Sequence, residues 1–327
     1  MKKLTIKDIA NLAGVSFKTV SRVLNKEQNV KKETREKIEK ILLETNFSIN
    51  YNAKRLSISR TKQIGLVTNT VLDYELNKNY IIMNYIVNYA RKRGYTILVN
   101  RSFKELVKNN FDKIDSGFYE GLIFLNPKNS DEVEKAVQSN LPVVISGISE
   151  KYIYVGTDQY ESAYIATETL IRKGCKDICI LLGDSNTKTT NEKYRGYKQV
   201  IDKFKMKENV YYNYSSSEEV EKFIISKYKD KKLPDGLVIN SDYAALGAIR
   251  AINKLGIKCP EKLKIISFGN TFICNEVYPS LSSMKQKFDI IAKELVDKII
   301  YMIENEGKKA QSYKIPAELV ERDTILK

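Results

Sequence analysis

Apolar positions three and four residues apart mark three short helices within the first 45 residues of the chain. The apolar face of the first is Ile6, Ile9, Ala10 and Ala13; that of the second is Val20, Val23 and Leu24; and that of the third, within residues 33–44, is Ile38, Ile41 and Leu42. Because three such faces can close on one another, this stretch predicts a miniature helical core.

Start signals precede the first two helices. Thr5 and Asp8 form a capping box, and Ser16 is placed as the N-cap of the second helix. Hydrophobic staples flank both caps, Leu4 with Ile9 and Val15 with Val20. Gly14 supplies a tight turn between the helices, where glycine tolerates a backbone that most residues resist. The segment therefore predicts a helix-turn-helix.

The second helix leaves Phe17, Lys18, Ser21 and Arg22 facing outward. A basic side chain can pair with guanine edges, and an aromatic edge can meet a thymine methyl group, which points to base recognition in the major groove. The alternative is a small helical bundle with an ordinary polar surface, but two caps, two staples and a glycine turn favour the DNA-binding interpretation.

Charge is concentrated at the same end of the chain. Residues 1–60 hold 14 Lys and Arg against 6 Asp and Glu, which is a net +8 of the total +15. A concentrated positive end is the electrostatic footprint of a protein that binds the phosphate backbone. The remaining excess is lysine-rich and scattered, as expected of a solvated surface.

From Lys62 onward the pattern changes to short, β-rich apolar runs separated by longer helical stretches. The predicted strands are 64–67, 96–99, 121–125, 142–145, 178–182, 236–239 and 263–268, and the predicted helices include 80–92, 161–172, 191–204, 243–255 and 289–303. Continuous apolar strands between helices predict parallel sheets covered on both faces. Roughly 265 residues exceed one typical domain, so two lobes are expected.

The chain resembles the lactose/galactose-repressor (LacI/GalR) family of transcription regulators. The resemblance rests on Thr5–Asn25, on Val30-x-x-x-Thr34-Arg35, on Asn50…Ala53…Leu56 and, less densely, on Ile315–Arg322. It implies an all-α helix-turn-helix head and an α/β, two-lobed, periplasmic-binding-protein-like core with parallel sheets. It also implies a dimer or tetramer on double-stranded operator DNA, controlled by a small molecule or sometimes by a partner protein, and of these a homodimer is expected.

The same resemblance divides the chain. Residues 1–47 would form the head, 48–61 a hinge helix and linker, and 62–327 the core. In members of this family the chain crosses between the two lobes three times. The resemblance therefore assigns residues of about 62–158 and 286–316 to the N-lobe and residues of about 159–285 and 317–327 to the C-lobe.

Candidate DNA contacts follow from the motif and the resemblance. Phe17, Lys18 and Arg22 would read bases, while Thr5, Ser16, Thr19, Ser21 and Asn25 would mainly hold phosphates. Leu56 matches a leucine that wedges between base pairs and bends the duplex, and Asn50 and Ala53 match positions that face the DNA. The family often has proline before this hinge helix, where this chain has Ile49. An ordinary exposed linker is the alternative for this segment.

Three family landmarks locate the effector cleft, and the chain departs at each. A common arginine before a Gly-aromatic pair is replaced by Lys193, with Arg195 nearby but out of register. A common Asn-Asp pair reads Ser241-Asp242, in which Asp242 could equally serve as a helix N-cap.

In the third landmark, a Gly-aromatic-Asp loop, the aspartate is replaced by Gly269, and Asn270 follows. Tyr74 and Tyr80 fall where the family has an aromatic platform, although with 21 tyrosines in the chain a core or surface role is as well supported.

These departures change the expected ligand. Lysine lacks the planar fork of arginine, and a lost carboxylate removes charge-assisted hydrogen bonds of about 1.5–3 kcal/mol each. The effector is expected to be a sugar, a sugar phosphate or another small metabolite, with Lys193, Arg195 and Asn270 favouring an anionic one. The alternative is a degenerate pocket and control by a protein coregulator.

Composition excludes several classes. The chain has no histidine, which removes Ser-His-Asp and Cys-His catalysis, and its four cysteines match no metal motif. Such isolated thiols favour a reducing cytoplasm, and neither a membrane-spanning stretch nor a signal peptide is expected. No enzymatic activity, cofactor or metal is therefore predicted. A secreted solute-binding protein and an enzyme acting in the cleft are the other readings, and the helix-turn-helix weighs against both.

Overall fold

The computed structural model describes residues 6–24, 29–45, 60–68, 78–104, 106, 118–127, 130–306, 308 and 310–326. The chain forms two compact units, residues 1–61 and 62–327, and each is described by itself. Six predicted site residues lie outside the described ranges: Thr5, Asn25, Asn50, Ala53, Leu56 and Tyr74.

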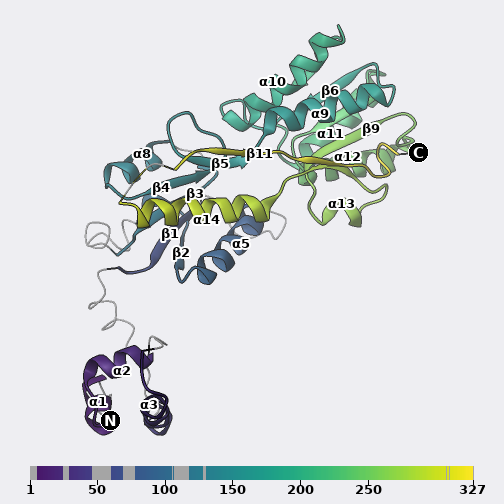
Figure 1. Cartoon of the computed structure of the whole chain (residues 1–327). Coiled ribbons are helices and arrows are strands. Elements are labelled where there is room, and N and C mark those ends of the chain that lie inside the picture. The colour runs from purple at the N-terminus through teal and green to yellow at the C-terminus, as the bar shows by residue number, and fades with distance from the viewer. Residues whose placement is uncertain are drawn as a thin grey trace. The chain divides into compact units, whose positions relative to one another are not determined.

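The first unit contains the three expected helices, α1 (Ile6–Ala13), α2 (Phe17–Leu24) and α3 (Lys32–Glu44) (Figure 1). Their buried core consists of Ile9, Ala10, Ala13, Val20, Val23 and Ile38, against which Val15, Val30, Ile41 and Leu42 pack. The described apolar positions thus face inward as their spacing predicts.

The turn between α1 and α2 has the expected chemistry. Gly14 adopts a φ of +65°, and its N–H donates to the carbonyl of Asn11 over 3.2 Å. Ser16 caps α2, because its Oγ accepts from the N–H of Thr19 at 3.2 Å and also lies 2.8 Å from the Thr19 hydroxyl. The structure thus confirms the predicted glycine turn and the Ser16 N-cap.

The second unit contains two six-stranded sheets. The first has the order β11-β5-β4-β3-β1-β2, and every pair in it is parallel. Its strands are β1 (Gln63–Thr68), β2 (Thr96–Asn100), β3 (Gly121–Leu125), β4 (Val143–Ser146), β5 (Tyr154–Thr157) and β11 (Tyr313–Ile315).

Helices cover both faces of the first sheet. The helices α5 (Lys78–Lys92) and α14 (Phe288–Glu304) lie side by side on one face, and α8 (Ser130–Gln138) lies toward the other (Figure 1). Successive strand residues point to opposite faces: Ile123 belongs to the cluster under α5 and α14, whereas Leu122 belongs to the cluster that includes Val133 of α8. The strands β1, β3 and β4 read as mostly apolar runs because both of their faces are buried.

The second sheet has the order β12-β10-β9-β8-β6-β7. Its strands are β6 (Ile178–Leu181), β7 (Val210–Tyr211), β8 (Gly236–Ile239), β9 (Lys264–Gly269), β10 (Ser282–Lys285) and β12 (Glu318–Val320). All pairs are parallel except β10 with the edge strand β12, which is antiparallel. The predicted parallel sheets are therefore present in both lobes, with one antiparallel edge strand.

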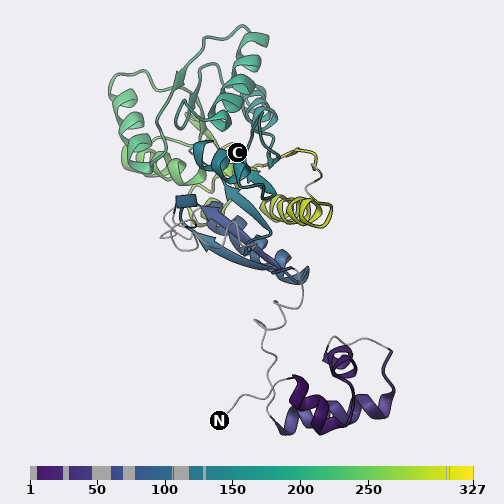
Figure 2. The same ribbon diagram turned by 90° about the vertical axis from the view of Figure 1, so that its left-hand side faces the viewer.

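Two helix pairs sandwich the second sheet. The helices α9 (Gln159–Arg172) and α10 (Lys188–Lys203) lie on one side, and α11 (Ser217–Lys229) and α12 (Asp242–Leu255) lie on the other (Figure 2). The short helix α13 (Ile273–Glu276) follows β9. Ile180 packs toward the first pair and Leu181 toward the second.

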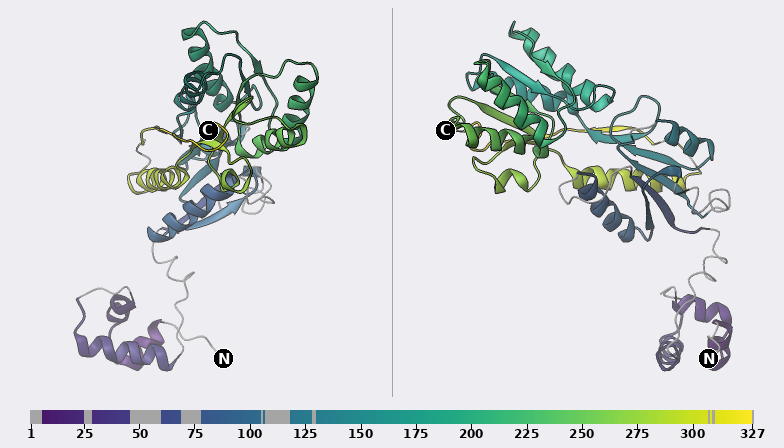
Figure 3. Two further views of the ribbon diagram at one scale, coloured as in Figure 1. Left: turned by 90° about the vertical axis from the view of Figure 1, so that its right-hand side faces the viewer. Right: turned by 180° about the vertical axis from the view of Figure 1, so that it is seen from behind.

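The chain passes between the two sheets three times, from β5 to α9, from β10 to α14 and from β11 to β12 (Figure 3). All five helices predicted for this unit begin one to three residues earlier in the structure than the sequence suggests. The helices α9 and α10 begin two and three residues earlier than predicted, because Asp158 and Thr187 act as their N-caps. Ser241, not Asp242, caps α12, since the Ser241 side chain accepts from the N–H of Ala244.

Candidate nucleic-acid interface and interlobe pocket

The outer face of α2 carries the side chains expected to read bases. Phe17 is 52% exposed although it is a large apolar residue, Lys18 is exposed, and Ser21 and Arg22 are half-buried. Val20 and Val23, on the opposite face, fix the orientation of the helix by packing into the core. An exposed aromatic ring beside basic side chains on a capped helix fits a groove of DNA. The individual DNA contacts stay predictions.

The proposed phosphate contacts include the cap itself. Ser16 and Thr19 share a hydrogen bond at the N-terminus of α2, where the backbone N–H groups of a helix favour anions. Ser16 is exposed and Thr19 is half-buried.

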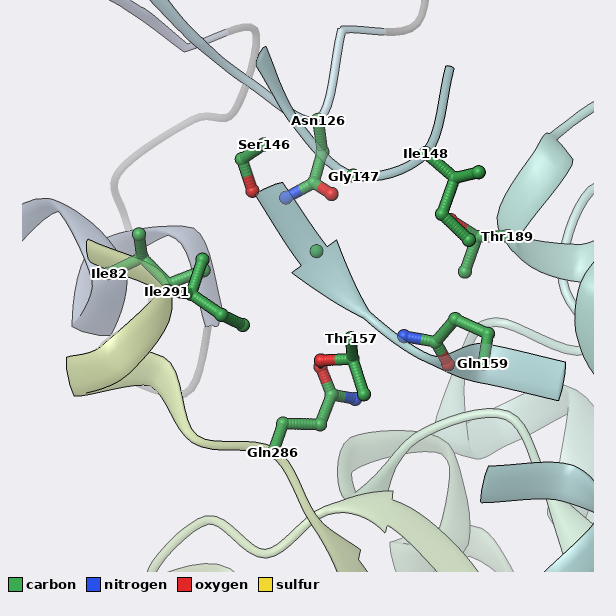
Figure 4. Close-up of a pocket in the computed structure, with 11 residues that line it drawn as sticks. Ile82, Asn126, Ser146, Gly147, Ile148, Thr157, Gln159, Thr189, Gln286 and Ile291 are labelled. Atoms are coloured by element: carbon green, nitrogen blue, oxygen red, sulfur yellow. The ribbon is translucent and has the colours of Figure 1, made fainter. Parts of the chain in front are cut away.

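A pocket lies between the lobes of the second unit. Residues at the carboxyl ends of β3, β4 and β5 line it from the first lobe (Figure 4). Gln159 of α9 and Thr189 of α10 line it from the second lobe, and Gln286 lines it from the segment between β10 and α14. The lining consists of Ile82, Asn126, Ser146, Gly147, Ile148, Gly156, Thr157, Gln159, Thr189, Gln286 and Ile291. The enclosed space is about 20 Å³, room for roughly one water molecule, so a larger ligand requires the lobes or side chains to move.

Among the described residues that line this pocket, the polar side chains are all uncharged. The Thr157 hydroxyl donates to Gln286 Oε1 at 3.2 Å, and Asn126 Nδ2 donates to Asn79 Oδ1 at 2.5 Å. Gln159 is only 5% exposed, and its Oε1 has no hydrogen-bond partner in the described part of the chain. A buried acceptor without a partner is costly, so a donor on a ligand would stabilise it.

Lys193 is buried inside the second lobe. It is 3% exposed, and its Nζ donates to the backbone O of Asn240 at 2.9 Å and to Asn240 Oδ1 at 3.1 Å. The same Nζ lies 4.1 Å from the ring centroid of Phe268. The ammonium therefore holds the carboxyl ends of β8 and β9 together, and Lys193 is not among the residues that line the pocket.

Asp242 is also engaged within the second lobe. Its Oδ1 accepts from the hydroxyls of Ser267 at 2.6 Å and Ser283 at 2.7 Å. Its Oδ2 accepts from the backbone N–H of Thr271 at 2.7 Å and from the Thr271 hydroxyl at 2.9 Å. Four donors satisfy the carboxylate, which ties α12 to β9, β10 and the loop that follows β9.

The loop after β9 is built around this carboxylate. Gly269 has a φ of +139°, and Asn270 follows with a φ of +56°. The N–H of Asn270 donates to Ser283 Oγ at 3.0 Å, and the buried Asn270 Oδ1 has no partner among the described residues.

Arg195 lies apart from these groups. Its exposed guanidinium pairs with Glu192 at 2.5 Å and lies 5.7 Å from the ring of Tyr160. Lys193 and Arg195 are two residues apart on α10 and so point to different faces of that helix. The structure thus brings Lys193, Asp242 and Asn270 to one end of the second sheet and leaves Arg195 elsewhere. Tyr80 is half-buried in α5.

Sequence reasoning missed the uncharged pocket residues. Asn126 and Ser146 directly follow predicted apolar strands, which is the place where ligand-binding side chains of parallel sheets occur, so their position could have identified them. Gln159 and Gln286 lie in the crossing segments, where no sequence pattern distinguishes them.

None of the described helices is long and apolar enough to span a membrane. The described residues also contain no cluster of three or more Cys, Asp or Glu side chains able to hold a metal ion.

Both units of the chain match models of known protein families. A model of "Bacterial regulatory proteins, lacI family" matches residues 5–50, and a model of a periplasmic binding protein-like domain matches residues 167–325. Catabolite control protein A of Staphylococcus epidermidis is 31% identical over 290 residues, which cover 86% of this chain and 87% of that protein.

Two solved structures are similar over most of the chain. The lac repressor dimer bound to operator and the anti-inducer ONPF has a TM-score of 0.85 and 22% identity, covering 100% of both chains. A periplasmic binding protein/LacI transcriptional regulator from Alkaliphilus metalliredigens, complexed with D-xylulofuranose, has a TM-score of 0.69 and 26% identity, covering 81% of this chain and 100% of the other.

Proposed function

The chain belongs to the LacI family of bacterial regulatory proteins, and from this premise we propose that it represses transcription as a homodimer on a pseudo-palindromic operator. Family membership confirms two sequence-based predictions: the chain is a DNA-binding transcription regulator rather than an enzyme, and it joins a helix-turn-helix head to a two-lobed core. We also propose that it acts in the cytoplasm, where bacterial operators lie.

We propose that the exposed face of α2 recognises the operator sequence. Phe17, Lys18 and Arg22 would contact base edges, while Ser16, Thr19 and Ser21 would contact phosphates together with Thr5 and Asn25. Residues 1–47 would act as the head and 48–61 as the hinge, in which Leu56 would enter the minor groove beside Asn50 and Ala53. The operator-bound dimer of the lac repressor supports this arrangement by similarity of fold.

We propose that the effector is a neutral, hydroxyl-bearing small molecule of the sugar class, bound in the interlobe pocket. The single observation that carries this is the unpartnered Oε1 of Gln159 within an uncharged lining. None of the described lining residues carries a positive charge, so burying an anion against them would be strongly unfavourable. The D-xylulofuranose complex of the related regulator supports a sugar. Of the groups expected to favour an anionic ligand, Lys193 bonds to Asn240 and Arg195 to Glu192.

Control of DNA affinity would follow from lobe movement. The pocket is too small for a sugar, so the lobes or side chains must move on binding. Where the lobes move, a ligand shifts the equilibrium between two lobe arrangements by its differential affinity for them. A shift in the N-lobes of a dimer would change the spacing of its heads.

A thermal-shift screen of the full chain tests the effector proposal. Neutral pentoses, hexoses and disaccharides are compared with their phosphates, with nucleobases and with amino acids. A ligand at 100 times its Kd adds about 2.7 kcal/mol of stability, which raises Tm measurably. The proposal expects hits among neutral sugars that Gln159→Ala abolishes. Hits confined to sugar phosphates would contradict the neutral pocket, and no hit at all would contradict small-molecule control and favour a protein coregulator.

A further inference from the structure

One face of α10 carries two ion pairs that join the lobes. Lys188 and Glu192 are four residues apart and so lie on the same side of the helix. Lys188 Nζ lies 2.6 Å from Oε1 of Glu150, which follows β4 of the first lobe. Glu192 Oε2 lies 3.2 Å from Nζ of Lys314, which belongs to β11 of the first sheet. The α10 helix therefore bridges to the first lobe at two points.

The first of these pairs lies at the edge of the interlobe pocket. Ile148, two residues before Glu150, and Thr189, next to Lys188, both line the pocket. Figure 4 shows Ile148 and Thr189 beside each other, one from each lobe. Separating the lobes at this edge must break the contact between Glu150 and Lys188.

The second pair is reinforced by Arg195. The side chain of Glu192 is 14% exposed, and it accepts from both Lys314 and Arg195. Burial by itself raises the pKa of Glu192, but the hydrogen bonds from Lys314 and Arg195 outweigh it and lower the pKa of this carboxyl. The carboxylate is thus held in its charged form between a cation of each lobe.

We propose that α10 is the closing element of the effector cleft, and that the pairs Glu150–Lys188 and Glu192–Lys314 set the fraction of molecules with closed lobes. The inference deepens the proposed effector site and rests on it for its regulatory meaning. It also gives Arg195 a role: it positions Glu192 for the contact with Lys314.

Removing one ion pair should change the free energy of lobe closure only slightly, but this change is enough to shift the equilibrium between open and closed lobes. Exposed ion pairs contribute little in most proteins, up to about a fivefold change in an equilibrium constant. The side chains of Lys188 and Glu150 are 46% and 88% exposed, so removing this pair should increase the open fraction by about two- to fivefold.

A cysteine at Thr189 reports on closure without DNA or effector. Thr189 is half-buried in the pocket, so lobe opening exposes it, and the rate of reaction with a maleimide measures the open fraction. The four native cysteines should react slowly with the maleimide, because burial keeps their thiols protonated. Burial raises the pKa of Cys175 to about 11 and the pKa of Cys259 and Cys274 to about 12, and it also raises the pKa of the fully buried Cys179.

The variants are made in the full chain carrying Thr189→Cys. Lys188→Gln and Glu150→Gln remove the pair at the edge of the pocket, and Glu150→Lys with Lys188→Glu exchanges its charges. Lys151→Gln is the matched control, since Lys151 neighbours Glu150 but pairs at 3.1 Å with Glu134 of α8 in the same lobe.

The proposal expects Lys188→Gln and Glu150→Gln to raise the labelling rate about two- to fivefold, the control to leave it unchanged and the charge exchange to restore it. Equal rates in all variants, or a charge exchange that labels as fast as the single variants, would overturn it. Neither outcome depends on the effector or the operator, so failure of the closing contact is distinguishable from failure of the proposed function. Circular dichroism of each variant confirms folding.

Discussion

A Cβ atom at position 269 would lie 2.6 Å from Oδ2 of Asp242. The carboxylate of Asp242 thus occupies the space next to Gly269 that any side chain there would need. Glycine at 269 and aspartate at 242 are therefore linked: the acidic group at this end of the second sheet belongs to Asp242, where it organises the loop after β9.

Gly269→Ala should destabilise the core by about 3–5 kcal/mol, because it combines a positive φ with a clash against a carboxylate that accepts four hydrogen bonds. Gly94→Ala is the matched control. Gly94 has a φ of +77° with nothing within 4 Å of its Cβ position, so it should lose only about 1–2 kcal/mol. Urea unfolding measures both, and equal losses in the two variants would show that the Asp242 contact is not a constraint.

Lys193→Met should lower stability by about 1–3 kcal/mol, because the backbone carbonyl of the half-buried Asn240 loses its donor. Effector binding should survive, since Lys193 does not line the pocket. Lys198→Met, on the same helix with exposed partners, should leave stability nearly unchanged. Unfolding curves and the effector-induced Tm shift together decide the role of Lys193. Unchanged stability with loss of the Tm shift would make it a ligand contact instead.

Arg22→Ala should lose about 1–3 kcal/mol of discrimination between the operator and unrelated DNA, as expected when a side chain stops reading a base pair. Ser21→Ala, at a proposed phosphate contact, should weaken both complexes by a similar factor. Fluorescence anisotropy at fixed salt on operator and scrambled duplexes measures this. If Arg22→Ala weakens the two complexes equally, Arg22 contacts only the backbone.

Leu56→Ala should keep the half-site contacts of the heads and lose the bend at the operator centre, because alanine is too short to unstack a base step. Circular-permutation gels measure the bend, and anisotropy measures the remaining affinity. A duplex that is still kinked by Leu56→Ala would show that the wedge assignment is wrong.

The described helices of the head could be predicted from sequence because their determinants are local. The Ser16 cap, the glycine turn and the apolar spacing act within a few residues, and the structure reproduces each of them. Seven of the twelve described strands were predicted from continuous apolar runs, as expected of strands buried on both faces, whereas β5, β7, β10, β11 and β12 were not predicted.

The site in the core was less predictable because its contacts join distant segments. Lys193 is satisfied by Asn240, 47 residues away, and Asp242 by Ser283, 41 residues away. The interlobe pocket is lined by two side-chain amides, Gln159 and Gln286, from different crossing segments of the chain. Only the folded structure brings these two residues together. The domain boundaries and the individual DNA contacts stay predictions.

Selection of bound duplexes from random-sequence DNA by the full chain shows whether the protein recognises a symmetric operator. We expect enrichment of one inverted repeat whose half-sites are bound by the two heads of a dimer, and we expect Arg22→Ala to fail to enrich the same bases. No enrichment above the random pool at physiological salt, or enrichment of a single half-site without symmetry, would contradict this expectation.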